Sequence, residues 1–151
     1  MKRINKERQL KNMEMLDKIK QKALEEHIPI IMDDTLEVIA KYLTKMRPER
    51  ILEIGTAVGY SAICFSKYLN DDGVIDTIER DGKRVKEAEV NIKKMNLGNK
   101  INIYEGDAVE ILPIINQKYD AVFIDAAKGK ISLFSKRSFK DDKTKWYYFC
   151  G

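Results

Sequence analysis

The chain has 151 residues, of which 44% are hydrophobic and 34% charged, and its formal net charge is +4. This length fits a single domain with one core, and the composition is that of a folded protein and not of a disordered one. No apolar run approaches the roughly 20 residues that cross a bilayer. The first residues also lack the apolar block of a signal peptide, so we expect a cytoplasmic protein with no membrane partner.

The positive charge is concentrated late in the chain. Residues 131–151 carry five basic and two acidic side chains, a net charge of +3, which leaves +1 for all the other residues. This distribution is not the electrostatic footprint of a general RNA-binding surface, although it allows a local basic patch. Cys64 and Cys150 fit no metal or redox spacing, so we expect reduced thiols, with Cys64 packed inside a helix.

Helices are expected before Pro48. Residues 5–26 are polar with apolar side chains at helical spacing, which predicts one or two amphipathic helices. Pro29 cannot continue such a helix. Asp33 or Asp34 can cap the next helix, which we expect to end before Pro48. The apolar stripe of this second helix consists of Leu36, Ile39, Ala40 and Leu43.

After Pro48, short apolar runs alternate with helical stretches, a pattern typical of βαβ units and a parallel sheet. We therefore predict an α/β fold. The predicted strands lie near 51–54, 74–78, 101–104 and 121–124, and the predicted helices near 61–69, 83–95 and 108–115. The residues expected to cover the sheet from the second of these helices are Val85, Ala88, Ile92 and Met95.

A glycine-containing turn follows the first predicted strand, in the stretch Glu53-Ile-Gly55-Thr-Ala-Val-Gly59-Tyr-Ser61. Glycines at a strand-to-helix turn let the backbone approach a ligand closely, and the amides at the start of the following helix attract a carboxylate or phosphate. The alternative is a tight turn with no ligand. The turn alone does not decide between these two interpretations.

Polar residues also follow the other three predicted strands. Glu79 ends the second strand, 20 residues after Gly59, at the spacing where an acid accepts hydrogen bonds from ribose hydroxyls in dinucleotide-binding folds. Asp107 with Ala108 follows the third strand, and Asp125 follows the fourth. Since parallel strands end at one edge of a sheet, these residues predict a shared ligand site.

Two kinds of nucleotide cofactor fit such a site. Nicotinamide and flavin nucleotides require G-x-G-x-x-G, whose second glycine lets the backbone approach a pyrophosphate. In this sequence Gly55 and Gly59 are separated by Thr-Ala-Val, so the middle glycine is missing. The spacing therefore favours S-adenosylmethionine, which carries no pyrophosphate, over NAD.

The ordered motifs E-x-G-x-x-x-G-Y-S (53–61), T-I-E-R (77–80), G-D-A (106–108) and D-A-A-K-G (125–129) resemble family 3 O-methyltransferases. That family includes the catechol and caffeoyl-coenzyme A enzymes and the bacterial tRNA 5-hydroxyuridine methyltransferases. The segment Glu25-Glu-His-Ile-Pro-Ile-Ile31 resembles the bacterial members, where this stretch approaches the cofactor. The resemblance spans Glu25 to Lys130. It implies a Rossmann-like S-adenosylmethionine-dependent methyltransferase fold, with a helical segment (1–47) before a cofactor-binding core (48–130).

The resemblance also implies roles for individual residues. Cofactor binding would involve Glu53, Gly55, Gly59 and Ser61 around the methionine end, Glu79 at the ribose, Asp107 and Ala108 at the adenine, and also Asp125. Asp125 would be the first ligand of a divalent metal, Mg²⁺, which prefers oxygen ligands. Lys128 would be the catalytic base on the acceptor hydroxyl of a tRNA 5-hydroxyuridine or a small hydroxyaromatic. The alternative for Lys128 is a solvated surface lysine.

The resemblance ends at Lys130, after which the chain reads ISLFSKRSFKDDKTKWYYFCG. A permissible coding of this tail, shifted by one base, gives YPSFLKDLLKMIKPNGIIFA, the helix, turn and strand typical of the family. We therefore expect 131–151 to be an out-of-frame tail, produced by an extra adenine in the codons near Lys130, in a fold truncated after its fourth strand. A genuine divergent tail is the alternative.

Such a chain would lack two of three expected metal ligands. We expect it to be inactive in methyl transfer and to form homodimers or aggregates through the unpaired edge of its fourth strand. The alternative function is a non-catalytic S-adenosylmethionine-binding or interaction module.

Overall fold

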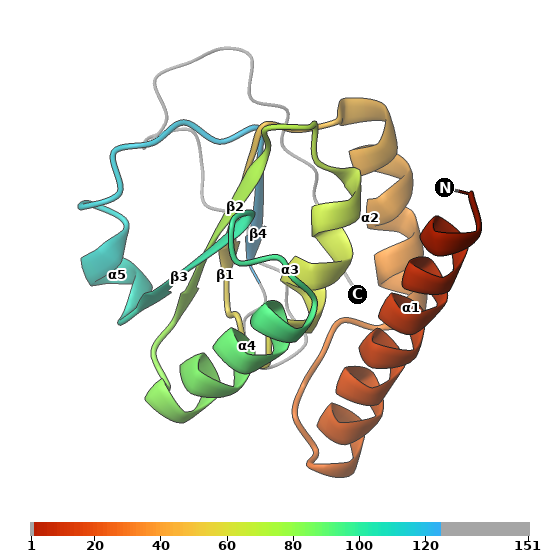
Figure 1. Ribbon diagram of the computed structural model, residues 1–151. Coiled ribbons are helices and arrows are strands. Elements are labelled where there is room, and N and C mark those ends of the chain that lie inside the picture. Colours follow the sequence, from red (N-terminus) through yellow and green to blue (C-terminus); the bar gives the residue numbers. More distant parts are fainter. Residues whose placement is uncertain (1, 125–151) are drawn as a thin grey trace.

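The computed structural model describes residues 2–124, with side chains from residue 6 onward. Helices and strands alternate after two N-terminal helices (Figure 1). In chain order the elements are α1 (Lys2–Glu25), α2 (Asp33–Met46), β1 (Arg50–Ile54), α3 (Tyr60–Phe65), the short 3₁₀ helix η1 (Ser66–Tyr68), β2 (Val74–Glu79), α4 (Gly82–Lys94), β3 (Ile101–Glu105), α5 (Ala108–Ile111) and β4 (Ala121–Ile124).

The four strands form one parallel sheet in the order β3-β2-β1-β4, which confirms the predicted α/β fold. Ile54 at the end of β1 pairs with Ile78 of β2 and with Ile124 of β4, and Glu79 pairs with Glu105 of β3. This register places the carboxyl ends of all four strands at one edge of the sheet. The loops that follow β1, β2 and β3 therefore meet there.

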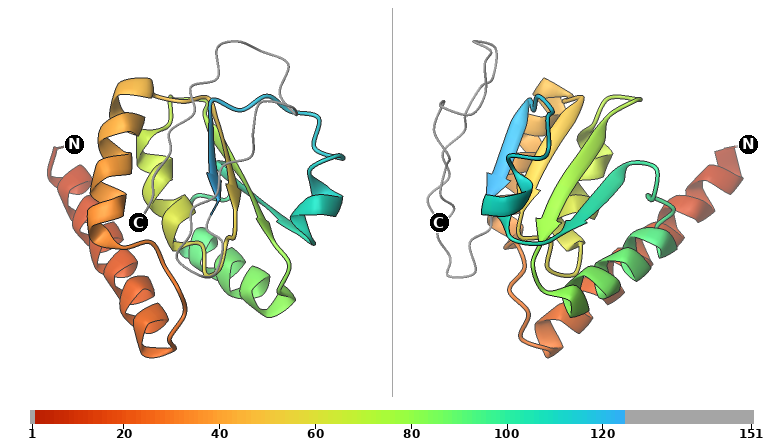
Figure 2. Two further views of the ribbon diagram at one scale, coloured as in Figure 1. Left: turned by 180° about the vertical axis from the view of Figure 1, so that it is seen from behind. Right: turned by 90° about the vertical axis from the view of Figure 1, so that its left-hand side faces the viewer.

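Helices cover both faces of the sheet (Figures 1 and 2). In the main core, the helices α1, α2, α3 and α4 pack on one face of the sheet. Helix α5 and the segment after it pack on the other face, around Leu52, Ile78 and Tyr119. Cover on both faces agrees with the burial of the middle residues of β1 and β2, whereas β3, with the sequence INIYE, is only partly buried.

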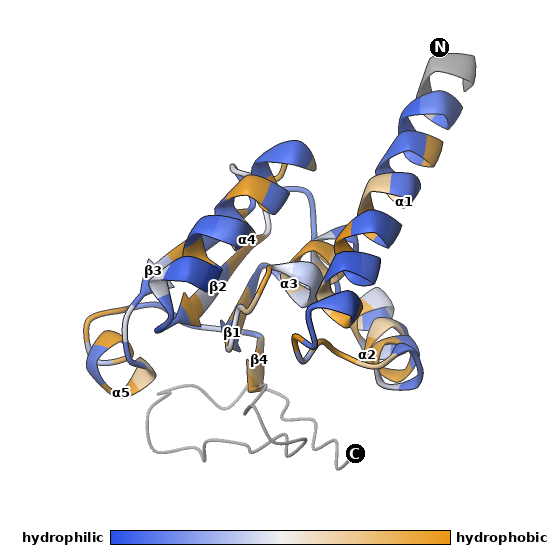
Figure 3. Ribbon diagram, turned by 90° about the horizontal axis from the view of Figure 1, so that it is seen from below, coloured by the Kyte–Doolittle hydropathy of each residue, from blue (hydrophilic) through white to orange (hydrophobic). Residues whose placement is uncertain are grey.

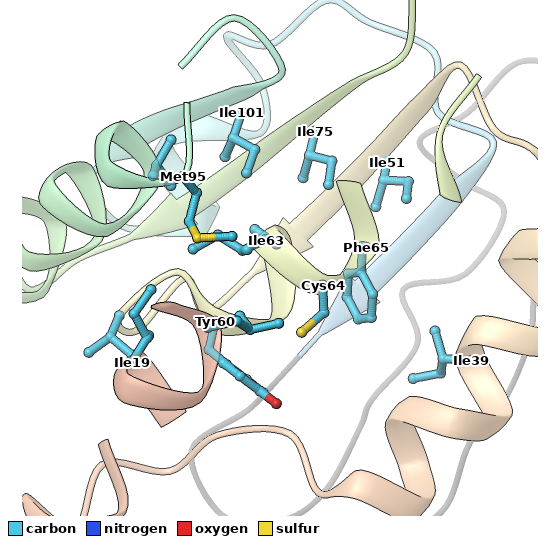
Figure 4. Close-up of a cluster of buried hydrophobic side chains, with 14 of the residues drawn as sticks. Ile19, Ile39, Ile51, Tyr60, Ile63, Cys64, Phe65, Ile75, Met95 and Ile101 are labelled. Carbon is cyan, nitrogen blue, oxygen red and sulfur yellow. The ribbon is translucent and has the colours of Figure 1, made fainter. Parts of the chain in front are cut away.

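Helix α3 forms a middle layer between the sheet and the outer helices. Ile63 and Phe65 are fully buried and lie between sheet residues such as Ile51 and the outer-helix residue Ile39 (Figure 4). Cys64 is also buried, as predicted, and this burial raises the pKa of its thiol to about 11. The helix that follows the glycine turn is therefore fixed by packing on both sides.

The stretch predicted at 5–26 belongs to one continuous helix, α1, which ends at Glu25. Its C-terminal half packs on the domain through Leu16, Ile19 and Ala23, whereas the half before Met15 extends beyond the core (Figure 3). None of the helices within residues 2–124 combines the length and the apolar character that a bilayer span requires.

The predicted cap of α2 is wrong. Met32 occupies the N-cap position and makes no side-chain capping bond, while Asp33 and Asp34 lie in the first turn. There their charges favour the positive end of the helix dipole. The Asp33 carboxylate instead accepts a 2.6 Å hydrogen bond from Lys20 of α1, which ties the two helices together.

Two predicted helices differ from the prediction in their extent. The stretch predicted at 61–69 divides into α3 and η1, and the one predicted at 108–115 is helical only to Ile111. Helix α4 agrees with the prediction, and all four residues of its predicted stripe are buried. Asp81 caps α4 by accepting hydrogen bonds from the amides of Lys83 and Arg84.

A buried carboxylate lies on the α5 face of the sheet. Asp76 of β2 is 1% exposed and accepts 2.8 Å hydrogen bonds from the Asn102 amide and the Tyr119 hydroxyl. Arg50 lies 3.8 Å away. Burial, together with this bond to Asp76, raises the pKa of Tyr119. The cluster joins β1, β2 and β3 to the segment that leads into β4.

We predict that Tyr119→Phe lowers the free energy of unfolding by about 1–3 kcal/mol, because it removes a donor from a buried charged acceptor. Urea denaturation monitored by circular dichroism measures the change. The control is Tyr68→Phe, since Tyr68 is partly buried but its hydroxyl has no hydrogen-bond partner among residues 6–124. Equal losses in both variants would contradict the role given to the Asp76 cluster.

Candidate ligand-binding site

A cavity of about 480 Å³ lies at the carboxyl ends of the strands. This volume is within the range of sites for small molecules. Its lining residues come from the loops after β1, β2 and β3, from the segment between α1 and α2, and from the end of β4. They are Ile28, Pro29, Ile54, Gly55, Ala57, Ile78, Glu79, Arg80, Asp81, Arg84, Gly106, Asp107, Ala108 and Ile124.

The loop after β1 contributes its backbone to the cavity. Gly55 and Gly59 adopt φ angles of 102° and 82°, in the region that favours glycine. A Cβ on Gly59 would lie 3.4 Å from the Cβ of Ala88, an ordinary contact distance, so the positive φ and not a lack of space is what favours glycine here. Ala57 has a φ of 47°, which is unusual for a residue with a side chain. The loop is thus held in a defined and partly strained shape.

Glu79 fixes this loop from the neighbouring strand. Its Oε2 accepts a 2.9 Å hydrogen bond from the amide of Ala57, and its Oε1 accepts a 3.0 Å bond from the amide of Asp81. Its backbone carbonyl accepts a 2.9 Å bond from the amide of Gly106. Glu79 therefore connects the three loops that line the cavity, and part of its carboxylate faces the cavity.

The structure places Glu53 away from the predicted direct contact with a cofactor. Its side chain is 1% exposed and does not line the cavity. Its Oε2 accepts a 2.6 Å hydrogen bond from the hydroxyl of Thr77, and its Oε1 accepts one from the hydroxyl of Ser61. Thr77 has only one hydroxyl proton, so Thr56 must donate in the 2.6 Å bond between the two threonines. Glu53 thus holds the loop from behind.

Gly59 and Ser61 also lie outside the cavity lining, whereas Gly55, Glu79, Asp107 and Ala108 belong to it. Asp107 caps α5, because its Oδ1 accepts a 2.9 Å hydrogen bond from the amide of Val109. Its other carboxylate oxygen makes no such capping bond. The structure therefore brings four of the predicted cofactor-binding residues together in the cavity lining. Three others, Glu53, Gly59 and Ser61, lie outside this lining.

The predicted metal ligand Asp125 and the predicted base Lys128 lie outside the described residues. Within residues 6–124, no group of three or more His, Cys, Asp or Glu side chains could hold a metal ion. The role of Asp125 as a cofactor contact also stays a prediction.

Three charged lining residues were not predicted as part of the site. Arg80, Asp81 and Arg84 lie beyond the end of β2 and give the cavity a charged rim. Pro29 and Ile28 form an apolar wall from the other side, at the segment whose sequence resembles the bacterial enzymes. The signal for Arg80 was its place in the T-I-E-R motif. Arg84 carries no local signal, because its position in the cavity depends on how α4 packs.

The lining combines two chemical characters. Ile54, Ile78 and Ile124 supply apolar surface at the strand ends, while Glu79 and Asp107 supply carboxylate acceptors. An acceptor pair beside apolar walls suits a ligand that has both hydroxyl groups and a flat ring, such as a nucleoside.

Solved structures of O-methyltransferases share this fold. An O-methyltransferase from Bacillus cereus in complex with SAH is 27% identical, with a TM-score of 0.69, and the match covers 77% of this chain and 56% of that one. The O-methyltransferase TomG from Streptomyces achromogenes in complex with SAM is 29% identical, with a TM-score of 0.68, over 77% of this chain and 55% of TomG. The fold is that of the Rossmann-like methyltransferases.

The family follows from the sequence comparison. The model of an O-methyltransferase family matches residues 5–143, and the chain belongs to this family. The match includes 131–143, so it does not separate the predicted tail from the domain. A catechol O-methyltransferase from Niastella koreensis is 37% identical over 84 residues, which are 53% of this chain and 38% of that protein. The chain therefore matches about half or less of the length of these relatives.

We predict that Gly59→Ala destabilises the fold by about 1–2 kcal/mol, because an L side chain at this positive φ is strained. Urea denaturation measures the effect. The matched variant is Ala57→Gly, which relieves the same kind of strain two residues earlier in the loop. It should leave stability nearly unchanged, since the relief offsets the flexibility of glycine. A Gly59→Ala variant as stable as wild type would mean that the loop adapts freely.

Proposed function

We propose that the chain binds S-adenosylmethionine in the cavity at the carboxyl ends of its strands. The observation that carries this proposal is the position of Glu79, whose carboxylate lines the cavity at the end of β2 while fixing the loop after β1. The O-methyltransferases of similar fold from Bacillus cereus and Streptomyces achromogenes are in complex with SAH and SAM, which supports the choice of ligand. In this proposal Glu79 accepts hydrogen bonds from the ribose hydroxyls, and Asp107 and Ala108 face the adenine.

The methionine end would lie toward the loop after β1. There the backbone from Gly55 to Ala57 faces the ligand, and Glu53 acts by positioning Ser61 and Thr77 instead of touching it. S-adenosylmethionine supplies a methyl group on a positively charged sulfonium. The carboxylates of the cavity would favour this charge, and its apolar walls would exclude water around the adenosine.

We further propose that the family reaction is methyl transfer to a hydroxyl group. Family membership supports O-methylation, and the Niastella relative acts on a catechol by its name. The acceptor would be a small hydroxyaromatic or the 5-hydroxyuridine of a tRNA. The apolar wall at Ile28 and Pro29, in the segment that resembles the bacterial tRNA enzymes, supports the second of these.

Metal binding by Asp125 and proton removal by Lys128 belong to the same proposal. Both residues follow β4 in the sequence, and Ile124, the last residue of β4, lines the cavity. Mg²⁺ would lower the pKa of the acceptor hydroxyl. Lys128 would then accept its proton and leave the oxyanion directed at the methyl group.

We predict that Glu79→Ala weakens S-adenosylmethionine binding at least about tenfold, as expected when a charged acceptor of hydrogen bonds is removed. Isothermal titration calorimetry measures the dissociation constant. Glu37→Ala serves as control, since Glu37 is exposed on α2 and only pairs with Lys41. Unchanged affinity in Glu79→Ala would remove its ribose role. Binding of NAD without binding of S-adenosylmethionine would favour a nicotinamide domain instead.

We also propose that residues 131–151 come from a shifted reading frame and that the chain is consequently inactive. Resequencing the lysine codons near Lys130 should reveal an extra adenine. Methyl transfer to a catechol or to tRNA should be absent from the chain and present in a frame-restored version. An unshifted gene would contradict the proposed origin of the tail. Activity in neither version would favour a non-catalytic cofactor-binding module.

A further inference from the structure

Four charged side chains connect the end of α1 to α4. Lys22 Nζ lies 2.7 Å from Glu87 Oε1 and 3.7 Å from Glu26 Oε1. Arg84 Nη1 lies 3.2 Å from Glu87 Oε2 and 4.0 Å from Glu26 Oε2. Each cation thus faces both carboxylates. We name this group of Lys22, Glu26, Arg84 and Glu87 the α1–α4 clamp.

Glu87 is the centre of the clamp. Its side chain is 16% exposed, against 28% for Arg84, 45% for Glu26 and 59% for Lys22. Burial acts to raise the pKa of Glu87, but the hydrogen bond and charge of Lys22, together with Arg84, outweigh this effect and lower the pKa. An isolated surface ion pair contributes little, whereas a partly buried carboxylate shared by two cations is held more firmly.

The clamp adjoins the candidate site on two sides. Arg84 itself lines the cavity. Lys22 lies in the last turn of α1 and Glu26 directly follows the helix, and there the amides of Glu26 and Ile28 donate to the carbonyls of Lys22 and Ala23 at 3.0 Å and 2.8 Å. The chain then passes directly into Ile28 and Pro29, the apolar wall of the cavity. The position of this wall therefore depends on how the end of α1 is held.

We infer that Glu87 is a positioning residue, which fixes Arg84 and the Ile28–Pro29 wall around the cofactor without touching the cofactor itself. Glu87 is not among the lining residues of the cavity. The inference rests on the proposed binding of S-adenosylmethionine in this cavity. Since the clamp is built from ion pairs, its effect on the cofactor weakens with rising salt concentration.

Calorimetry with S-adenosylmethionine tests the inference on the full chain. Glu87→Gln should weaken binding about fivefold at about 0.05 M NaCl and less at about 0.5 M, where wild-type affinity falls toward that of the variant. Lys22→Met should give a similar loss, and the double variant should lose no more than the larger single loss, because both changes break one contact. Glu89→Gln is the matched control, since Glu89 is exposed on the same helix and forms no ion pair among residues 6–124. A Glu87→Gln affinity within twofold of wild type at low salt would overturn the inference.

Hydrogen exchange of the free chain separates this inference from the proposed function. In Glu87→Gln, the amides of residues 26–28 should exchange about fivefold faster than in wild type, while those of β1 keep their rates. If wild type fails to bind S-adenosylmethionine, the proposed function is wrong. Faster exchange in the variant would then still support the conclusion that the α1–α4 clamp restrains Ile28 and Pro29. Unchanged exchange would overturn that conclusion.

Discussion

The carboxylate of Glu53 provides the contact on which the candidate site depends. It lies inside the fold, where hydroxyl groups from Ser61 and Thr77 reach it from two different elements. Through Thr77 it also holds Thr56, so β1, β2, α3 and the loop between β1 and α3 share one hydrogen-bonded group. A buried carboxylate is costly unless its oxygens are satisfied, and this cost favours the one arrangement in which all the hydroxyls point inward. The conformation of the loop that lines the cavity is therefore fixed by hydrogen bonds on its buried side.

The order of elements and the position of the site could be predicted because both depend on local patterns. The apolar runs at 51–54 and 121–124 predicted the strands β1 and β4, and the stripe from Val85 to Met95 predicted α4, which packs on β2 and β3. Since parallel strands end at one edge, polar residues after each strand had to come together. Gly55, Glu79 and Asp107, from the ends of three strands, line one cavity.

Other features depend on tertiary packing and carry no such local signal. A motif resemblance assigned Glu53 to the ligand, but only the approach of Thr77 and Ser61 shows that it is buried behind the loop. Asp33 has a side chain suited to capping a helix, but Met32 occupies the N-cap position. The Asp33 carboxylate instead accepts a hydrogen bond from the Lys20 ammonium. The place of Arg84 in the cavity follows from the angle at which α4 lies on the sheet, which no spacing in the sequence expresses.

Part of the cavity is lined by residues with little or no side chain, and this has a consequence for how such sequences diverge. Gly55, Ala57 and Gly106 are lining residues of this kind, so side chains away from the lining can change over evolutionary time without altering this part of the cavity surface. Relatives with 27% and 29% identity accordingly keep the same architecture, with TM-scores of 0.69 and 0.68. We therefore expect sequence divergence in this fold to be limited mainly by the backbone conformation of the loops and by buried groups, such as Glu53, that fix it.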